Sequence, residues 1–165
     1  MMKALFEGYE SLVELHEDSL YESKHSLENL SGLVQHVAET LQNHGFFCLW
    51  LQGNLGAGKT TFTRSLLSKL GLHDSITVGS PTFTYLNEYE INNKIYAHMD
   101  FYRLPKNSLV NQMFDLEKFD GFFLEWPQQI AIPPLLEPTH FLHITKEEGS
   151  QLHSYRFTHL KQSAT

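Results

Sequence analysis

Residues 46–61 read FFCLWLQGNLGAGKTT, and this stretch decides the fold of the 165-residue chain. Its first part, residues 46–52, is a continuous apolar run with a glycine on either side. That pattern is typical of a strand buried on both faces at the centre of an α/β sheet. Residues 53–58 form a loop punctuated by glycine, and the apolar spacing after it predicts a helix over residues 59–70 that ends at Gly71. We therefore expect an α/β fold built around this strand–loop–helix unit.

The loop contains a complete G-x-x-x-x-G-K-T motif, which runs from Gly53 to Thr60. With a buried strand before it and a helix after it, this motif is typical of the phosphate-binding loop of P-loop proteins. Backbone N–H groups in such a loop point inward around a phosphate, and the helix adds the positive end of its dipole. Lys59 is expected to reach the β- and γ-phosphates, and the Thr60 hydroxyl to ligate Mg²⁺. The residues predicted to bind the nucleotide are Asn54, Leu55, Gly56, Ala57, Gly58, Lys59, Thr60 and Thr61.

A P-loop protein that hydrolyses nucleotide needs acidic side chains at strand ends, both for the metal and for the attacking water. Asp100 ends the apolar stretch IYAHMD, and Glu125 ends FFLE. We predict that both carboxylates act in catalysis with Lys59 and that both are candidate metal ligands with Thr60. The sequence leaves the division of metal and water roles between the two acids open.

Charge and cysteine content narrow the class of protein further. The chain has 19 acidic and 12 basic residues, for a net charge of −7, and most of the excess acid precedes residue 46. Because no strongly basic stripe occurs, tight binding of nucleic acid by this chain alone is not expected. The single cysteine, Cys48, favours a reducing compartment without a disulfide framework or a disulfide-linked partner. The longest apolar run is too short to span a bilayer, so we expect a cytoplasmic location and no membrane association.

The rest of the chain predicts a single domain, residues 1–165, with a helical N-terminal segment and a middle rich in β-hairpin. An amphipathic acidic helix is expected over residues 2–20, within an N-terminal extension of residues 1–25. A second helix is expected to begin with Ser26 as its N-cap and to continue to about residue 42. A hairpin turn is predicted at Asn92 and Asn93, because asparagine tolerates left-handed backbone. The other predicted elements are strands over residues 82–89, 94–101, 121–126, 140–145 and 152–159 and a helix over residues 108–119.

Two polar or aromatic features beside these elements each fit two interpretations. The segment SPTFT carries hydroxyls at Ser80, Thr82 and Thr84. It fits a switch-like loop that offers them to the metal or the γ-phosphate, and it also fits an ordinary turn before a strand. Trp126 fits stacking on a ligand or partner, and it also fits core packing at a strand end.

Four segments in this order, LQGNLGAGKTTF, SPTFTYLNEY, HMDFYRL and FFLEWP, resemble the TsaE (YjeE) family over about residues 46–144. That family consists of small bacterial P-loop ATPases required to make threonylcarbamoyladenosine in tRNA. The resemblance implies a P-loop α/β domain with a mixed sheet flanked by helices, and it implies ATP and Mg²⁺ as ligands. It also implies weak ATP hydrolysis in support of a TsaD–TsaB heterodimer, with tRNA contacted only indirectly.

The resemblance carries roles over motif by motif. It assigns phosphate and Mg²⁺ binding to Lys59 and Thr60, and a metal-side or water-positioning role to Asp100. Glu125 becomes the Walker-B-like acid, with Trp126 as its functionally important neighbour. The hydroxyl residues of SPTFT become part of a switch-like segment that changes with hydrolysis.

Two other functions remain as alternatives from the residues themselves. A small-molecule P-loop kinase would need a cationic lid, but the chain has only three arginines, at Arg64, Arg103 and Arg156, and they do not cluster in sequence. A nucleotide-regulated binding module, in which ATP occupancy orders a partner surface without essential turnover, is compatible with the same motif.

Overall fold

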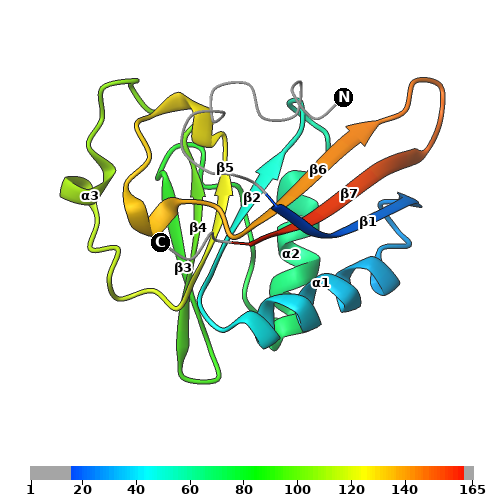
Figure 1. Ribbon diagram of the computed structural model, residues 1–165, viewed down its shortest axis with the longest axis horizontal. Coiled ribbons are helices and arrows are strands. Elements are labelled where there is room, and N and C mark those ends of the chain that lie inside the picture. Colours follow the sequence, from blue (N-terminus) through cyan, green and yellow to red (C-terminus); the bar gives the residue numbers. More distant parts are fainter. Residues whose placement is uncertain (1–15, 162–165) are drawn as a thin grey trace.

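One seven-stranded mixed sheet organises residues 16–161, which are the residues that the computed structural model describes (Figure 1). The sheet order is β1-β7-β6-β2-β5-β4-β3. The strands are β1 (His16–Ser26), β2 (Phe47–Gln52), β3 (Leu86–Ile91), β4 (Lys94–Asp100), β5 (Gly121–Glu125), β6 (His140–Lys146) and β7 (Leu152–Lys161). The helices are α1 (Ser31–His44), α2 (Lys59–Leu70) and α3 (Val110–Met113), and two 3₁₀ turns are η2 (Pro127–Gln129) and η3 (Pro134–Leu136). The predicted α/β class is therefore confirmed, as are the strands that became β2, β4, β5, β6 and β7.

The four central strands, β6-β2-β5-β4, run parallel, and antiparallel strands extend the sheet at both edges. Leu51 of β2 pairs with Glu125 of β5, and Glu125 pairs in turn with Asp100 of β4. The carboxyl ends of the three strands therefore meet at one edge of the sheet. In open α/β sheets this edge is where ligands bind.

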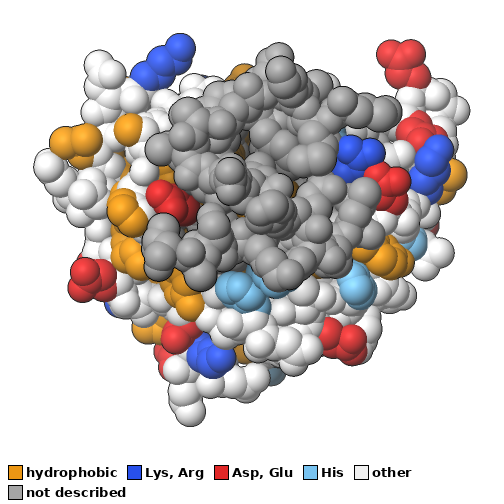
Figure 2. Space-filling model, in the orientation of Figure 1, with side chains coloured by type: hydrophobic (Ala, Val, Ile, Leu, Met, Phe, Trp, Pro, Cys, Tyr) orange, Lys and Arg blue, Asp and Glu red, His pale blue; other side chains and the backbone are white. Residues whose placement is uncertain are grey.

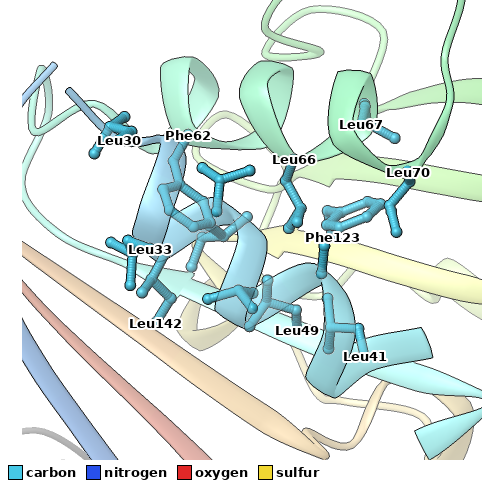
Figure 3. Close-up of a cluster of buried hydrophobic side chains, with 14 of the residues drawn as sticks. Leu30, Leu33, Leu41, Leu49, Phe62, Leu66, Leu67, Leu70, Phe123 and Leu142 are labelled. Carbon is cyan, nitrogen blue, oxygen red and sulfur yellow. The ribbon is translucent and has the colours of Figure 1, made fainter. Parts of the chain in front are cut away.

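Helices α1 and α2 cover one face of the sheet, and their apolar side chains interlock with those of the central strands (Figure 3). From α2 the buried side chains are Phe62, Leu66, Leu67 and Leu70, as the apolar spacing predicts. The helix ends at Gly71, whose φ of 114° and hydrogen bonds to Leu67 and Ser68 confirm the predicted C-cap. Each fully buried Leu or Phe contributes about 1.5–3 kcal/mol relative to an exposed one, so this layer fixes the start of α2 against β2.

The opposite face is covered mainly by the chain between β4 and β6 rather than by a long helix. The predicted helix over residues 108–119 is wrong: α3 is only four residues long and ends at Met113, because the backbone of Phe114 is extended. The chain then bends so that Leu116 and Phe119 are buried on this face of the sheet, in a hydrophobic cluster with Phe122 and Phe141. Burial of these side chains against the sheet outweighs the weak local preference for continuing the helix.

The N-terminal prediction needs a second correction. Residues 16–20, expected at the end of the acidic helix, belong to strand β1, and residues 2–15 of that helix lie outside the described residues. Strand β1 pairs with β7 along its whole length, from His16 opposite Lys161 to Ser26 opposite Leu152. An unpaired β7 would leave a long edge of backbone donors and acceptors, so pairing decides the conformation here. Ser26 ends this strand instead of capping a helix, and α1 begins five residues later, at Ser31.

The predicted hairpin is confirmed at Asn92 and Asn93, which have φ values of 52° and 61° between β3 and β4. Strand β3 nevertheless begins at Leu86, four residues later than predicted. Before it the chain turns tightly: Tyr85 has a φ of 65° and donates its N–H to the carbonyl of Pro81 (2.6 Å). The carbonyl of Tyr85 then accepts the N–H of Asp100 (3.2 Å), which ties this turn to the end of β4.

Candidate nucleotide-binding site

The glycine loop joins β2 to α2 in the geometry that the motif requires. Gly58 occupies the N-cap position of α2 with a φ of 103°, a left-handed conformation that suits glycine. At Gly53 the constraint is space, because a Cβ there would lie 2.6 Å from the carbonyl oxygen of Ile144 in β6. His153 of β7 also holds the loop, with its buried Nδ1 donating to the carbonyl of Ala57 (2.9 Å). Strands from the far end of the chain therefore fix the shape of the loop.

Lys59 lies across the loop and is only 5% exposed. Its ammonium donates to the carbonyls of Gly53 (2.7 Å) and Asn54 (3.2 Å) and lies 4.5 Å from the centre of the Trp126 ring. Burial lowers the pKa of Lys59, while the charges of Glu125 and Asp100 act in the opposite direction. A cation with little water around it interacts strongly with a nearby phosphate.

The two predicted acids lie side by side at the ends of neighbouring strands, and each is only 3% exposed. Glu125 Oε1 accepts hydrogen bonds from Thr60 Oγ1 (3.2 Å) and from His98 Nε2 (2.8 Å). The structure thus places Lys59, Thr60, Asp100 and Glu125 around one cleft, although they come from three separate segments.

Asp100 connects the cleft to the SPTFT segment. Its Oδ2 accepts a hydrogen bond from Thr82 Oγ1 (2.7 Å) and lies 3.2 Å from Ser80 Oγ, and the two hydroxyls lie 2.6 Å apart. Its Oδ1 accepts the N–H of Tyr102 (2.9 Å). Thr84 is not part of this arrangement, because its hydroxyl bonds to Asn87 at the start of β3.

The cleft has a volume of about 370 Å³, within the usual range for small-molecule sites. Its lining includes eight of the predicted nucleotide-binding or switch residues of the loop and the SPTFT segment: Leu55, Gly56, Gly58, Lys59, Thr60, Thr61, Ser80 and Thr82. Asn54 and Ala57 instead line a smaller neighbouring hollow beside the end of β6. Trp126 also borders the cleft, with a left-handed backbone (φ 56°) and its ring 4.9 Å from that of Tyr102.

Sequence reasoning missed three residues of the site as functional candidates: Leu27, Tyr102 and His98. Leu27 lies in the turn between β1 and α1, and its Cδ2 lies 3.0 Å from where a Cβ on Gly58 would be. Tyr102 follows β4 and lines the cleft. For His98 the signal was the strand period, because a residue two before Asp100 shares its face of β4.

The oxygen ligands in this cleft fit Mg²⁺. Thr60, Asp100 and Glu125 supply a hydroxyl and two carboxylates, the hard oxygen donors that this ion prefers. Within residues 16–161 there is no cluster of three His, Cys, Asp or Glu side chains that could hold a metal ion by themselves. Mg²⁺ in a nucleotide site does not require three such protein ligands, since phosphate oxygens and water complete its coordination.

A glycine loop between a buried strand and a helix, facing a lysine, a threonine and two strand-end acids, defines the chain as a P-loop α/β protein. Within that class the chain belongs to the TsaE family, because the model of the "Threonylcarbamoyl adenosine biosynthesis protein TsaE" family matches residues 24–155.

Individual relatives agree with this assignment. The chain is 35% identical over 120 residues to the tRNA threonylcarbamoyladenosine biosynthesis protein TsaE of Aquifex aeolicus, covering 71% of this chain and 81% of that protein. It is 31% identical over 117 residues to the protein of the same name from Rickettsia conorii, covering 68% and 65%. The crystal structure of YdiB from Bacillus subtilis shares the fold, with a TM-score of 0.62, 24% identity, and coverage of 88% of this chain and 89% of that one.

Two further features of the described residues are their surface charges and the hydropathy of their helices. In Figure 2 the visible side chains of described acidic and basic residues lie interspersed. Among residues 16–161, no helix combines the length and apolarity needed to cross a membrane.

Proposed function

We propose that this chain is a Mg²⁺-dependent ATPase that supports the threonylcarbamoyladenosine modification of tRNA together with TsaD and TsaB homologues. The observation that carries the ATPase part is the pair of buried carboxylates, Asp100 and Glu125, which face Lys59 and Thr60 across one cleft. Family membership supports the pathway and the partners. The net charge of −7 favours indirect rather than direct contact with tRNA.

In the proposed mechanism, Lys59 and the loop N–H groups hold the β- and γ-phosphates of ATP. Bound Mg²⁺ would neutralise charge that develops on the phosphate oxygens. The hydrogen bond from Thr60 to Glu125 supports Glu125 as the acid on the metal side. Asp100, the neighbouring acid, is then available to orient water for in-line attack on the γ-phosphate.

The hydroxyls of Ser80 and Thr82 support a switch role for their segment. Both hydroxyls lie within hydrogen-bond distance of the same oxygen of Asp100, so a change in the surroundings of that carboxylate alters contacts of the segment directly. We propose that ATP binding and hydrolysis change these contacts and, through them, the affinity for TsaD–TsaB.

The test is steady-state ATP hydrolysis by the purified chain, alone and with its cognate TsaD–TsaB pair. We expect slow turnover alone, faster turnover with the pair, and loss of turnover with retained nucleotide binding in Asp100→Ala. Asp115→Ala is the matched control, because Asp115 is an exposed acid outside the cleft. Absence of stimulation together with absence of co-elution with the pair would exclude the proposed partnership.

A nucleotide-regulated binding module remains the second candidate, and the direct link between Asp100 and the SPTFT segment favours it. In that case a non-hydrolysable ATP analogue would support the full tRNA modification activity of the reconstituted pair. A small-molecule kinase has less support: Arg64 donates to the carbonyl of Val78 and Arg156 pairs with Glu22, so only Arg103 lines the cleft.

A further inference from the structure

His98 is a buried histidine behind the cleft. It lies on β4 between Asn87 of β3 and Phe123 of β5, and its side chain has no exposed surface. Its Nε2 lies 2.8 Å from Glu125 Oε1. Because a carboxylate oxygen can only accept, the ring must donate from Nε2.

The other ring nitrogen makes the position unusual for a purely structural residue. His98 Nδ1 is buried and has no hydrogen-bond partner among the described residues. A buried polar atom without a partner costs about 1–3 kcal/mol, so an apolar side chain would serve this core position better. The hydrogen bond to Glu125 is the contact that sets the imidazole apart from such a side chain.

We propose that His98 is a positioning residue for Glu125, and that it acts by fixing the orientation of the carboxylate from inside the core. This inference rests on the proposed function, because Glu125 matters only if the cleft binds nucleotide with a metal. Thr60 and His98 both donate to Oε1, one from α2 and the other from β4. Two donors on one oxygen hold the plane of the carboxylate and direct Oε2 to other ligands.

Loss of the imidazole donor leaves the carboxylate held by Thr60 alone. Glu125 could then rotate about its terminal torsion, since that torsion has broad energy wells. Partners that orient a metal-binding group in this way are typically worth about 10- to 100-fold in metal affinity or activity. We therefore expect the effect of His98 to be largest on measurements that depend on magnesium.

Two amide substitutions separate the hydrogen bond from the burial of a polar side chain. Glutamine places its amide nitrogen near the position of Nε2, whereas asparagine is shorter and reaches only the position of Nδ1. Variants His98→Gln and His98→Asn thus put the same chemical group into the same core site with different reach. His140→Leu is the control, since His140 is also fully buried but bonds to Thr139 at the start of β6, outside the cleft.

The readouts are the dissociation constant of ATP with Mg²⁺ and with EDTA, the turnover number with TsaD–TsaB, and thermal stability. For His98→Asn we expect the affinity gained from magnesium and the turnover number each to fall about 10- to 100-fold, with affinity in EDTA unchanged. His98→Gln should retain both within a few-fold, and His140→Leu should retain the ratio of affinities with and without magnesium.

Two results would overturn the inference. One is wild-type magnesium dependence and turnover in His98→Asn, and the other is equal losses in both amide variants. Failure of the proposed function gives a result that can be distinguished from these two. The wild-type chain itself would then bind ATP without any contribution from magnesium, and the proposed role of His98 would be refuted as well.

Discussion

Substitution of His140 by phenylalanine should make the protein less sensitive to acid. His140 is completely buried at the start of β6, with its ring stacked between those of Phe157 (5.7 Å between centroids) and His159 (4.5 Å). Burial, together with the nearby His159 and His44, lowers the pKa of His140 to about 3. In the unfolded chain the pKa of this group returns to about 6.5.

The sign and size of the effect follow from these two values. A histidine whose pKa is lowered on folding contributes stability that is fully present above pH 6.5 and is lost progressively as the pH falls toward 3. Between pH 8 and pH 5 the unfolded chain takes up a proton that the native protein excludes. With these pKa values the loss is about 2 kcal/mol in the free energy of unfolding at pH 5.

The assay is urea unfolding of the wild type and of His140→Phe at pH 8, 7, 6 and 5. Phenylalanine keeps the planar ring, and Thr139 Oγ1 keeps its hydrogen bonds to the backbone of Cys48. We expect the decrease in unfolding free energy between pH 8 and pH 5 to be smaller by about 2 kcal/mol in the variant. His73→Ala, which changes an exposed histidine, serves as control. Equal decreases in the wild type and in His140→Phe would refute the reasoning.

Three further predictions concern the loop, the core and the SPTFT segment. Gly53→Ala places a Cβ 2.6 Å from the Ile144 carbonyl, so thermal unfolding and ATP titration should show a destabilised protein with weakened binding; wild-type values would contradict this. Burial raises the pKa of the Cys48 thiol, so a thiol reagent should label Cys48 only as fast as the protein unfolds, and rapid labelling of the native protein would be inconsistent with the structure. Thr82→Val removes a hydrogen bond to the Asp100 carboxylate and should lower the unfolding free energy by about 1.5–3 kcal/mol in urea. Thr84→Val changes an exposed residue whose hydroxyl bonds to Asn87, and it should cost less than about 0.5 kcal/mol. Similar losses of unfolding free energy in the two threonine variants would contradict this prediction.

The elements that the sequence predicted best are those whose signals are local. Strand β2 and helix α2 agree with the prediction almost residue for residue, because an apolar run, a glycine loop and a helical stripe each report on their own segment. The proximity of Asp100 and Glu125 could also be predicted, since both residues end parallel strands and such ends share one edge of the sheet.

The elements that the sequence failed to predict depend on partners far away in the chain. Strand β1 is polar and lacks a clear alternation, and its conformation follows from pairing with β7 more than 120 residues later. The helix predicted over residues 108–119 is short because Leu116 and Phe119 pack against the sheet. His98 carried a periodicity signal, but only the register of β4 against β5 showed its contact with Glu125.

The central claim, that the loop and its strand-end acids form an ATP site, is tested most directly by isothermal titration of ATP with Mg²⁺ into the wild type and Lys59→Ala. Removal of the lysine deletes the one buried cation beside both carboxylates in the described cleft. We predict saturable binding of one ATP by the wild type and a loss of at least about 10-fold in affinity in the variant, which corresponds to about 1.4 kcal/mol. No binding by the folded wild type, or equal affinities in the two proteins, would contradict the account.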